Sequence, residues 1–179
     1  MKYTVEKLIN ENSNLKFLFF WGHQPSKDGS ITKACFSQWY ESSFTVDGIT
    51  YKTAEHWMMA KKATLFNDFI ALQKIVEANT AAEAKKLGRE VLNYDESTWL
   101  KHRFEIVKEG NWHKFNQNKE LCEFLLNTKN RVLVEASPVD AIWGIGMASD
   151  HDNINNPSAW RGLNLLGFAL MEVRDKLEQ

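Results

Sequence analysis

The sequence predicts an α+β fold: a predominantly helical single domain over residues 1–179 with a small hairpin-containing sheet. Three observations support this prediction. The chain has 179 residues, of which 44 % are hydrophobic, enough for one domain with a core of its own. Apolar residues recur at helical spacing from residue 54 onward. Asp47-Gly48 lies between two short β-type segments, the strongest short-range signal for a hairpin. Residues 1–16 are expected to form an N-terminal extension.

Strands are predicted in four short segments. Residues 16–22 form an apolar run closed by Gly22, which is typical of a buried strand. Residues 42–46 and 49–51 flank Asp47-Gly48 and predict the two strands of the hairpin. Residues 131–136 contain the alternating Val132 and Val134 and predict another strand. We expect these strands to be connected mostly by hairpins.

Helix starts are indicated by polar residues that can cap a helix. Thr53 predicts a helix over residues 54–65, and Asn67 predicts another that runs to residue 76. Thr80-Ala-Ala-Glu83 matches a capping box and begins a helix that Gly88 could interrupt. Helical spacing of apolar residues predicts three further helices, over residues 97–115, 121–126 and 163–177.

Charge and cysteine content exclude several classes of protein. Lys and Arg number 22 against 23 Asp and Glu, so a broadly basic nucleic-acid surface is not expected. Cys35 and Cys122 lie among apolar neighbours without metal-ligand spacing, which favours buried thiols in a reducing compartment. The polar N-terminus lacks the apolar stretch of a signal peptide, and the apolar run 17–21 is too short to span a membrane. We therefore expect a soluble, cytoplasmic protein without a membrane partner.

The first candidate functional run is the helix that Thr53 begins. Glu55 and Lys62 are seven residues apart and so lie near one face of this helix. They either line a pocket, or act as a helix-dipole charge and a solvated charge, respectively. The position of Glu55 between Ala54 and Trp57, on the apolar side, is unusual for a purely solvated group. His56 has no histidine partner at helical spacing, so a hydrogen-bonding role is favoured over a metal ligand.

The second run is Asp140-Ala-Ile-Trp-Gly-Ile-Gly146, which follows a predicted strand. Gly144 and Gly146 allow close approach of the backbone to a ligand, although the run lacks the dinucleotide-binding fingerprint. Trp143 either stacks on a base or fills the core. Asp140 is either a catalytic carboxylate or a turn-forming residue before the glycines.

The third run joins a polar loop to the last predicted helix. Trp160 and Arg161 could hold a base and a phosphate, or Trp160 could be a hydrophobic staple for the helix. Asn164 is either a helix cap or a ligand for a sugar hydroxyl. Ser, Asn and Gly are enriched between Gly146 and Gly162, which is typical of a functional loop.

Taken together, these runs resemble the NADAR (YbiA-like) family in order and spacing over about residues 17 to 177. The N-terminal matches are Ser37-Gln38-Trp39, the hairpin 46–51, the helix with Glu55, His56, Trp57 and Lys62, and the dipeptide Gly88-Arg89. The C-terminal matches are Lys114-Phe115 with Leu121, then Asp140, Trp143-Gly144, Gly146, and the segments 160–167 and 170–174. Gln38 departs from the family pattern, which usually has Asn, and keeps the amide with a longer reach.

The resemblance implies a YbiA-like α+β fold with a pocket for ribose phosphate or ADP-ribose. It implies an N-glycosyl hydrolase that cleaves a riboflavin-pathway ribosylaminopyrimidine phosphate and releases ribose 5-phosphate. Alternatives are removal of ADP-ribose from guanine bases, where nucleic acid enters only as an ADP-ribosylated substrate, or a non-catalytic sensor of NAD or ADP-ribose. The balanced charge favours the small metabolite. No cofactor or metal is expected.

Cleavage of a ribose C1–N bond requires a carboxylate near C1, a proton for the leaving nitrogen and groups that hold the sugar. The resemblance makes Glu55 and Asp140 the candidate carboxylates. Lys62 is a candidate nucleophile if a ribosylamine opens to an imine, and otherwise a charge partner or phosphate anchor. The expected substrate-binding residues are Trp39, Arg89, Trp143, Gly144, Gly146, Trp160, Arg161 and Asn164.

Overall fold

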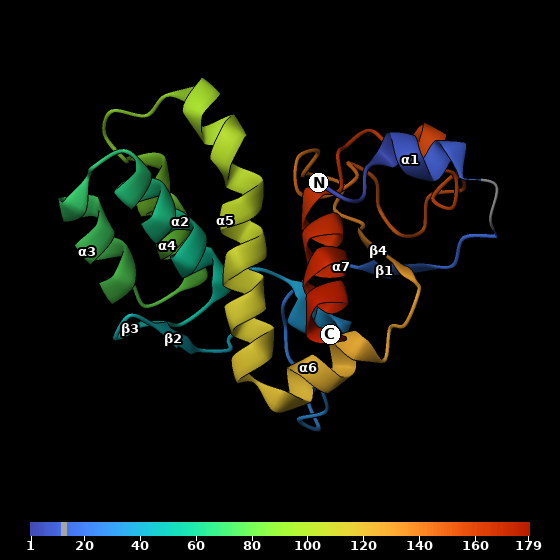
Figure 1. The fold of residues 1–179 in the computed structure, drawn as a ribbon, viewed down its shortest axis with the longest axis horizontal. Coiled ribbons are helices and arrows are strands. Elements are labelled where there is room, and N and C mark those ends of the chain that lie inside the picture. Colours follow the sequence, from blue (N-terminus) through green and yellow to red (C-terminus); the bar gives the residue numbers. More distant parts are fainter. Residues whose placement is uncertain (12–13) are drawn as a thin grey trace. The chain divides into compact units, whose positions relative to one another are not determined.

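The structure is a computed structural model that describes residues 1–11 and 14–179, and it confirms the α+β fold class (Figure 1). The described elements follow one another as α1 (Val5–Asn10), β1 (Phe17–Phe20), η1 (Lys33–Phe36), β2 (Phe44–Val46), β3 (Ile49–Tyr51), α2 (Ala54–Leu65), α3 (Phe69–Glu77), α4 (Ala81–Arg89), α5 (Glu96–Gln117), α6 (Lys119–Leu126), β4 (Val132–Glu135), η2 (Pro157–Ala159) and α7 (Leu165–Leu177). The chain forms two compact units. Unit 1 contains residues 1–37 and 120–179, and unit 2 contains residues 38–119.

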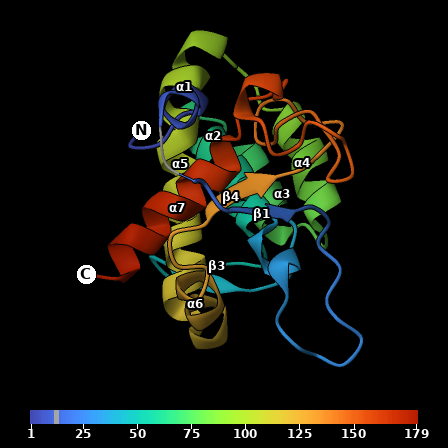
Figure 2. The ribbon, with the colours of Figure 1, turned by 90° about the vertical axis from the view of Figure 1, so that its right-hand side faces the viewer.

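Unit 1 is built around a parallel strand pair. β1 pairs with β4 in a register that places Phe17 opposite Val132 and Phe20 opposite Glu135. Helix α7 packs against β4 (Figure 2). Its side chains Phe168 and Leu170 are fully buried. This pairing corrects the expectation that hairpins connect most of the strands. Both strands are apolar runs, as is typical of buried parallel strands, but such a run does not indicate its own partner.

Unit 2 combines the predicted hairpin with the helices from α2 to α5. β2 and β3 pair antiparallel around Asp47 and Gly48, whose φ angles of 50° and 79° are those of the tight turn that Asp-Gly favours. The core of this unit contains Trp57, which is fully buried and packs against Phe44 and Tyr51. The hairpin prediction is therefore confirmed.

The capping residues largely begin the helices that they predict. Thr53 accepts a hydrogen bond from His56 N at the start of α2, and Thr80 accepts one from Glu83 N at the start of α4. Four starts differ from the prediction: α6 begins at Lys119 rather than at residue 121, α7 begins at Leu165 rather than at residue 163, and α3 and α5 differ as follows. Asp68 rather than Asn67 caps α3, because Asn67 adopts a left-handed conformation with φ 59°. Asp95 caps α5, so this helix begins at Glu96, before Ser97.

Three further findings refine the predictions. Gly88 does not interrupt α4, which continues to Arg89. The predicted N-terminal extension contains a short helix, α1, capped by Thr4. Both Cys35 and Cys122 are free; Cys35 is fully buried, as expected for a small apolar side chain, whereas Cys122 is only half-buried, so the expectation of two buried thiols holds for Cys35 alone. Among the described residues, no helix has both the length and the apolar character needed to cross a membrane.

Candidate active site

Glu55 is a shielded carboxylate in the first turn of α2. Its residue is only 2 % exposed, and its backbone N–H donates to the carbonyl of Gln38 at 2.9 Å. The helix begins here because Thr53 caps it, and a negative charge in a first turn is stabilised by the helix dipole. Because burying a carboxylate costs free energy, a fully shielded one is rarely a simple solvated charge. The position of Glu55 therefore favours a role inside the protein or toward a ligand.

A buried amide pair lies beside the start of α2. Asn111 of α5 donates from Nδ2 to Gln38 Oε1 at 2.7 Å and to the carbonyl of Val107 at 2.8 Å. Within the described residues, Gln38 Nε2 and Asn111 Oδ1 make no hydrogen bond. The pair therefore keeps a donor nitrogen and an acceptor oxygen, and a hydroxyl group can accept from the first and donate to the second.

Lys114 adds a fully buried amine on the same helix as Asn111. It follows Asn111 by three residues, which places the two side chains on neighbouring positions of one face of α5. Its Nζ lies 5.6 Å from the ring centroid of Tyr40 and 5.3 Å from that of Phe115. Aromatic faces stabilise a desolvated cation, so these contacts offset part of the cost of burying the Lys114 amine.

Lys62, two helical turns after Glu55, has a partly desolvated amine. Its Nζ donates to the carbonyl of Gly88 at 2.8 Å and lies 4.4 Å from the ring centroid of Tyr94 and 5.8 Å from that of Trp99. Burial lowers the pKa of Lys62. A lowered pKa raises the fraction of neutral amine, the form that attacks a carbonyl or imine. Lys61 points elsewhere, over the Trp57 ring at 4.4 Å.

The other two predicted residues of unit 2 lie on or near α4. Trp39 is half-buried, and Lys85 of α4 places its Nζ 5.6 Å from the Trp39 ring centroid. Arg89 is exposed at the last position of α4, directly after the glycine whose carbonyl binds Lys62. Unit 2 therefore contains Trp39, Glu55, Lys62 and Arg89.

His56 serves as a hydrogen-bonding residue of the fold. Its Nδ1 bonds the hydroxyl of Thr53 at 2.8 Å, and its Nε2 donates to the carbonyl of Ala78 at 3.1 Å. Burial is the main cause that lowers the pKa of His56, which favours the neutral ring. Nε2 thus holds α2 against the segment before α4, while Nδ1 bonds the N-cap of α2 itself, which is the hydrogen-bonding role that the sequence favoured.

Unit 1 contains the other seven predicted residues, most of them in two loops joined by backbone hydrogen bonds. Asp140 Oδ1 accepts from the backbone N–H groups of Ile142 and Trp143, both at 2.8 Å. Its carbonyl also accepts from Gly146 N at 3.0 Å. One carboxylate oxygen of Asp140, Oδ1, therefore forms the turn, as one of the two interpretations expected. A catalytic role would depend on the other oxygen.

The glycines of this region are required by backbone packing within unit 1. A Cβ at Gly144 would lie 2.8 Å from the carbonyl oxygen of Glu135, and one at Gly162 would lie 2.7 Å from Ala141 Cα. Gly146 has φ +66°, a conformation that favours glycine. Asn164 N donates to the carbonyl of Gly144 at 3.1 Å, which joins the two loops.

Two of the remaining residues are engaged by the fold and two are accessible. Trp160 is 9 % exposed, donates from Nε1 to the carbonyl of Ile154 and packs edge-on against Phe17. Asn164 is fully buried and bonds β4 through both ends of its amide, accepting from Glu135 N and donating to the carbonyl of Leu133. Trp143 is half-buried and Arg161 is exposed, so these two can meet a ligand directly.

Sequence reasoning did not propose Asn111 and Lys114 as site residues. Both are polar residues at helical spacing from the apolar Val107, on the buried face of α5. A polar residue within the apolar face of a predicted helix was therefore the sequence feature that could have identified them. The sequence does not show which segment packs against this face of α5. The proximity of Asn111 to Gln38 and Glu55 therefore became visible only in the folded structure.

The fold and these side chains define an α+β protein with a buried carboxylate and a desolvated lysine on one helix. Residues 19–178 match the NADAR domain, and the chain belongs to this family. This confirms the resemblance seen in the sequence.

Relatives of the chain include proteins named as N-glycosidases. The chain is 42 % identical over 170 residues to N-glycosidase R617 of Acanthamoeba polyphaga mimivirus, covering 92 % of this chain and 98 % of that protein. It is 34 % identical over 143 residues to riboflavin biosynthesis protein VVA0006 of Vibrio vulnificus, covering 80 % of this chain and 35 % of that protein. The NMR structure of the E. coli protein YbiA matches with a TM-score of 0.72 at 27 % identity, covering 91 % of this chain and 85 % of that one.

Proposed function

We propose that this protein is an N-glycosidase that hydrolyses the bond between ribose C1 and a nitrogen in a small ribosylated amine. The observation that carries the proposal is the 42 % identity to the mimivirus N-glycosidase over nearly the whole of both chains. The proposed substrate class is a ribosylaminopyrimidine phosphate of riboflavin biosynthesis, and the product is ribose 5-phosphate. The name of the Vibrio vulnificus relative supports this class, although the chain spans only 35 % of that protein.

Lys62 is the proposed nucleophile. In the ring-opened form of a ribosylamine, C1 is part of an imine, which a neutral amine attacks. A bond forms between Lys62 Nζ and C1, the bond between C1 and the base nitrogen breaks, and the base leaves as an amine with the two protons that Nζ gives up. Water then adds to the lysine Schiff base, which releases the sugar aldehyde and regenerates Lys62. Burial, which lowers the pKa of Lys62, supports this role.

Glu55 is the proposed group that moves protons in these steps. It lies on the same helix as Lys62, and a carboxylate shielded from water can exchange protons with a reacting nitrogen or water. The buried amide pair of Gln38 and Asn111 beside it supplies the donor and acceptor proposed to fix a sugar hydroxyl. Trp39 and Arg89 are proposed to contact the base and the phosphate.

The accessible groups of unit 1 are proposed to contribute separately. Asp140 keeps one carboxylate oxygen beyond its turn, Trp143 offers a partly exposed ring, and Arg161 offers an exposed guanidinium. These properties suit a carboxylate, a stacking surface and a phosphate ligand. Substitutions test the two charged groups: Asp140→Asn should lower turnover, whereas Arg161→Ala should mainly raise KM for a phosphorylated substrate.

A panel of N-ribosides tests the proposal. The purified chain is incubated with a ribosylaminopyrimidine phosphate, with ADP-ribosylated guanine in an oligonucleotide and with NAD, and the release of ribose 5-phosphate or ADP-ribose is measured. We expect ribose 5-phosphate from the first substrate. Preferential release of ADP-ribose from guanine would replace the proposed substrate class. Binding of ADP-ribose without turnover of any substrate would make the protein a sensor and refute the enzyme.

Borohydride trapping separates the two chemical routes. Sodium borohydride added during turnover should reduce the Schiff base and leave a sugar-sized mass on the peptide that contains Lys62. Lys62→Arg keeps a cation near the Gly88 carbonyl but removes the nucleophile, so turnover should fall by ~100-fold or more. Lys61→Arg, one residue away and over Trp57, is the matched control and should remain active. An active Lys62→Arg variant without any adduct would assign the reaction to direct attack by water.

A further inference from the structure

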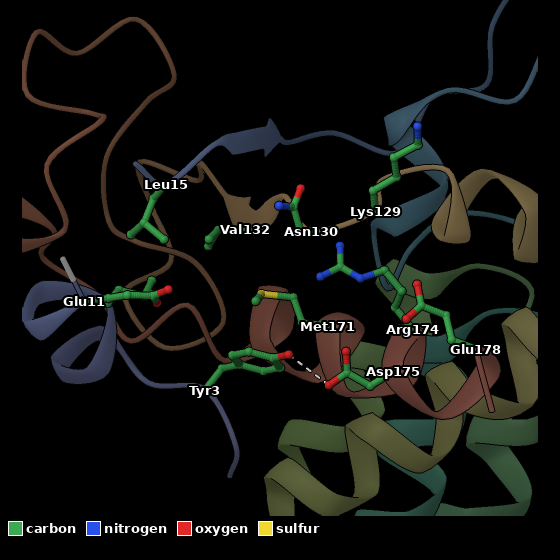
Figure 3. Close-up of a pocket in the computed structure, with 11 residues that line it drawn as sticks. Tyr3, Glu11, Leu15, Lys129, Asn130, Val132, Met171, Arg174, Asp175 and Glu178 are labelled. Carbon is green, nitrogen blue, oxygen red and sulfur yellow. Dashed lines mark hydrogen bonds between the residues drawn. The ribbon is translucent and has the colours of Figure 1, made fainter. Parts of the chain in front are cut away.

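A cavity of about 420 Å³ lies in unit 1, formed by the N-terminal segment, α7 and the chain just before β4 (Figure 3). It contains none of the residues proposed for N-glycoside cleavage. Leu8, Val132 and Met171 contribute apolar side chains that are each at most 5 % exposed. Polar and charged side chains line the rest of the cavity, so it offers an apolar surface beside groups that can bind a charged end of a small molecule.

Arg174 provides the charge of this cavity. The residue is only 3 % exposed, and its guanidinium extends toward Asn130 and Met171 (Figure 3). Its Nη1 donates to Thr128 Oγ1 at 2.7 Å and to the carbonyl of Arg131 at 2.9 Å. These bonds leave donors on Nη2 and Nε, and the ion pairs among the described residues do not include Arg174. Its hydrogen-bond partners are neutral, and Asp175 and Glu178 act on it only through space, so the remaining donors are suited to an anionic ligand.

The other charged groups around the cavity limit the charge of that ligand. Asp175 is already engaged, because its Oδ2 accepts from Tyr3 OH at 2.9 Å and pairs with Lys2 Nζ at 2.5 Å. Glu11 and Glu178 are exposed at the edge and oppose the exposed Lys129. One anionic charge can be balanced by the buried Arg174. The other cation at the cavity, Lys129, is outnumbered by the two edge carboxylates, so a second anionic charge would be repelled.

We propose that this cavity binds a small monocarboxylate with an apolar body. The carboxylate accepts hydrogen bonds from Arg174 and from the amide of Asn130, which lies beside the guanidinium in Figure 3. The apolar body packs on Leu8, Val132 and Met171, where it removes apolar surface from water. This site is separate from the proposed glycosidase chemistry, so either can fail without the other.

Ligand-observed NMR with hexanoate as the probe tests the site on the full chain. Saturation transfer from protein to hexanoate is measured together with two analogues of the same length: 1-hexanol, which lacks the charge, and hexyl phosphate, which carries more. We expect binding of hexanoate and at least tenfold weaker binding of both analogues, the scale of losing a charge-assisted hydrogen bond. Equal binding of hexanol, or no binding of hexanoate, would overturn the proposal, and equal binding of hexyl phosphate would overturn the monoanion assignment.

Two variants locate the binding. Asn130→Leu removes the amide and narrows the cavity at an exposed position, so it should fold and weaken hexanoate binding about tenfold. Asn127→Leu, an exposed residue of the same type outside the cavity, is the matched control and should bind as the original chain does. Arg174→Lys keeps the charge but loses the planar donors, and in folded protein it should also weaken binding. Unchanged binding in Asn130→Leu would place the ligand elsewhere.

Discussion

Replacing Gly110 with alanine should destabilise unit 2 even though alanine favours helices. A Cβ at Gly110 would lie 2.8 Å from Trp57 Nε1 and 2.9 Å from Trp57 Cγ, well inside the ~3.5–4.0 Å of an ordinary contact. Trp57 is fully buried and its Nε1 donates to the carbonyl of Ile106 at 2.8 Å, so the indole cannot move away freely. The helix α5 or the indole must shift.

The expected magnitude follows from three contributions. Overpacking of a core costs about 1–3 kcal/mol. Weakening of the indole hydrogen bond adds roughly 1 kcal/mol, and the better helix propensity of alanine returns about 1 kcal/mol. We therefore expect a loss of about 2 kcal/mol in the free energy of unfolding and, at this chain length, a fall in Tm of roughly 4–8 °C. Because Asn111 is the next residue, turnover should fall as well.

Urea denaturation followed by circular dichroism measures the effect. Gly88→Ala is the matched control, since it also adds a Cβ to a buried helical glycine but meets the flexible side chain of Met59, 2.7 Å from its Cγ. A methionine can change rotamer, so this variant should lose much less stability than Gly110→Ala. If Gly110→Ala were as stable as the original chain, the rigid packing of Trp57 against α5 would be refuted.

Four further outcomes are expected. Glu55→Gln should keep the fold and reduce turnover by ~100-fold or more, whereas a fully active folded variant would leave Glu55 only a helix-start charge. Adding ADP-ribose or a product analogue should quench intrinsic fluorescence, and Trp143→Phe should remove most of that change; an unchanged quench would move the stacking role to another tryptophan. Asn164→Ala should cost roughly 2–4 kcal/mol of unfolding free energy in urea, because it breaks two bonds to β4 and places alanine at φ 53°. Because burial lowers the pKa of His56, the unfolded chain binds a proton at higher pH than the folded one, so stability should fall as pH drops below about 6.5. Denaturation between pH 7 and 5 should show a shallower pH dependence for His56→Gln, and an identical dependence would contradict the assignment.

Local chemistry was sufficient for most of the helices and for the hairpin. Thr53 and Thr80 begin α2 and α4 because a hydroxyl can satisfy an N–H of the first turn without any distant partner. Asp47-Gly48 sets the hairpin for the same reason, since the turn is made by its own backbone. The errors at the starts of α3 and α5 are short-range as well: Asp68 rather than Asn67 caps α3, and Asp95, two residues before the predicted start, caps α5.

The candidate site was determined by the sequence only in part. The apolar neighbours of Glu55 indicated its burial, and the family resemblance made Lys62 a candidate nucleophile. The turn-forming role of Asp140 was one of two interpretations, and only the bonds from Ile142 and Trp143 show that one oxygen forms the turn. Whether Asn164 capped a helix or contacted a sugar was equally open, and its amide instead bonds the backbone of β4.

What the tertiary structure decided depends on residues that are distant in sequence. The parallel pairing of β1 with β4 brings Phe17 opposite Val132, and no turn signal records such a partner. The meeting of Gln38 with Asn111 and the cavity around Arg174 have the same origin. A cap or a tight turn makes its hydrogen bonds within a few residues, so the local sequence is enough to predict it. A buried amide or guanidinium is satisfied by partners from other elements, so its neighbours exist only once the chain has packed.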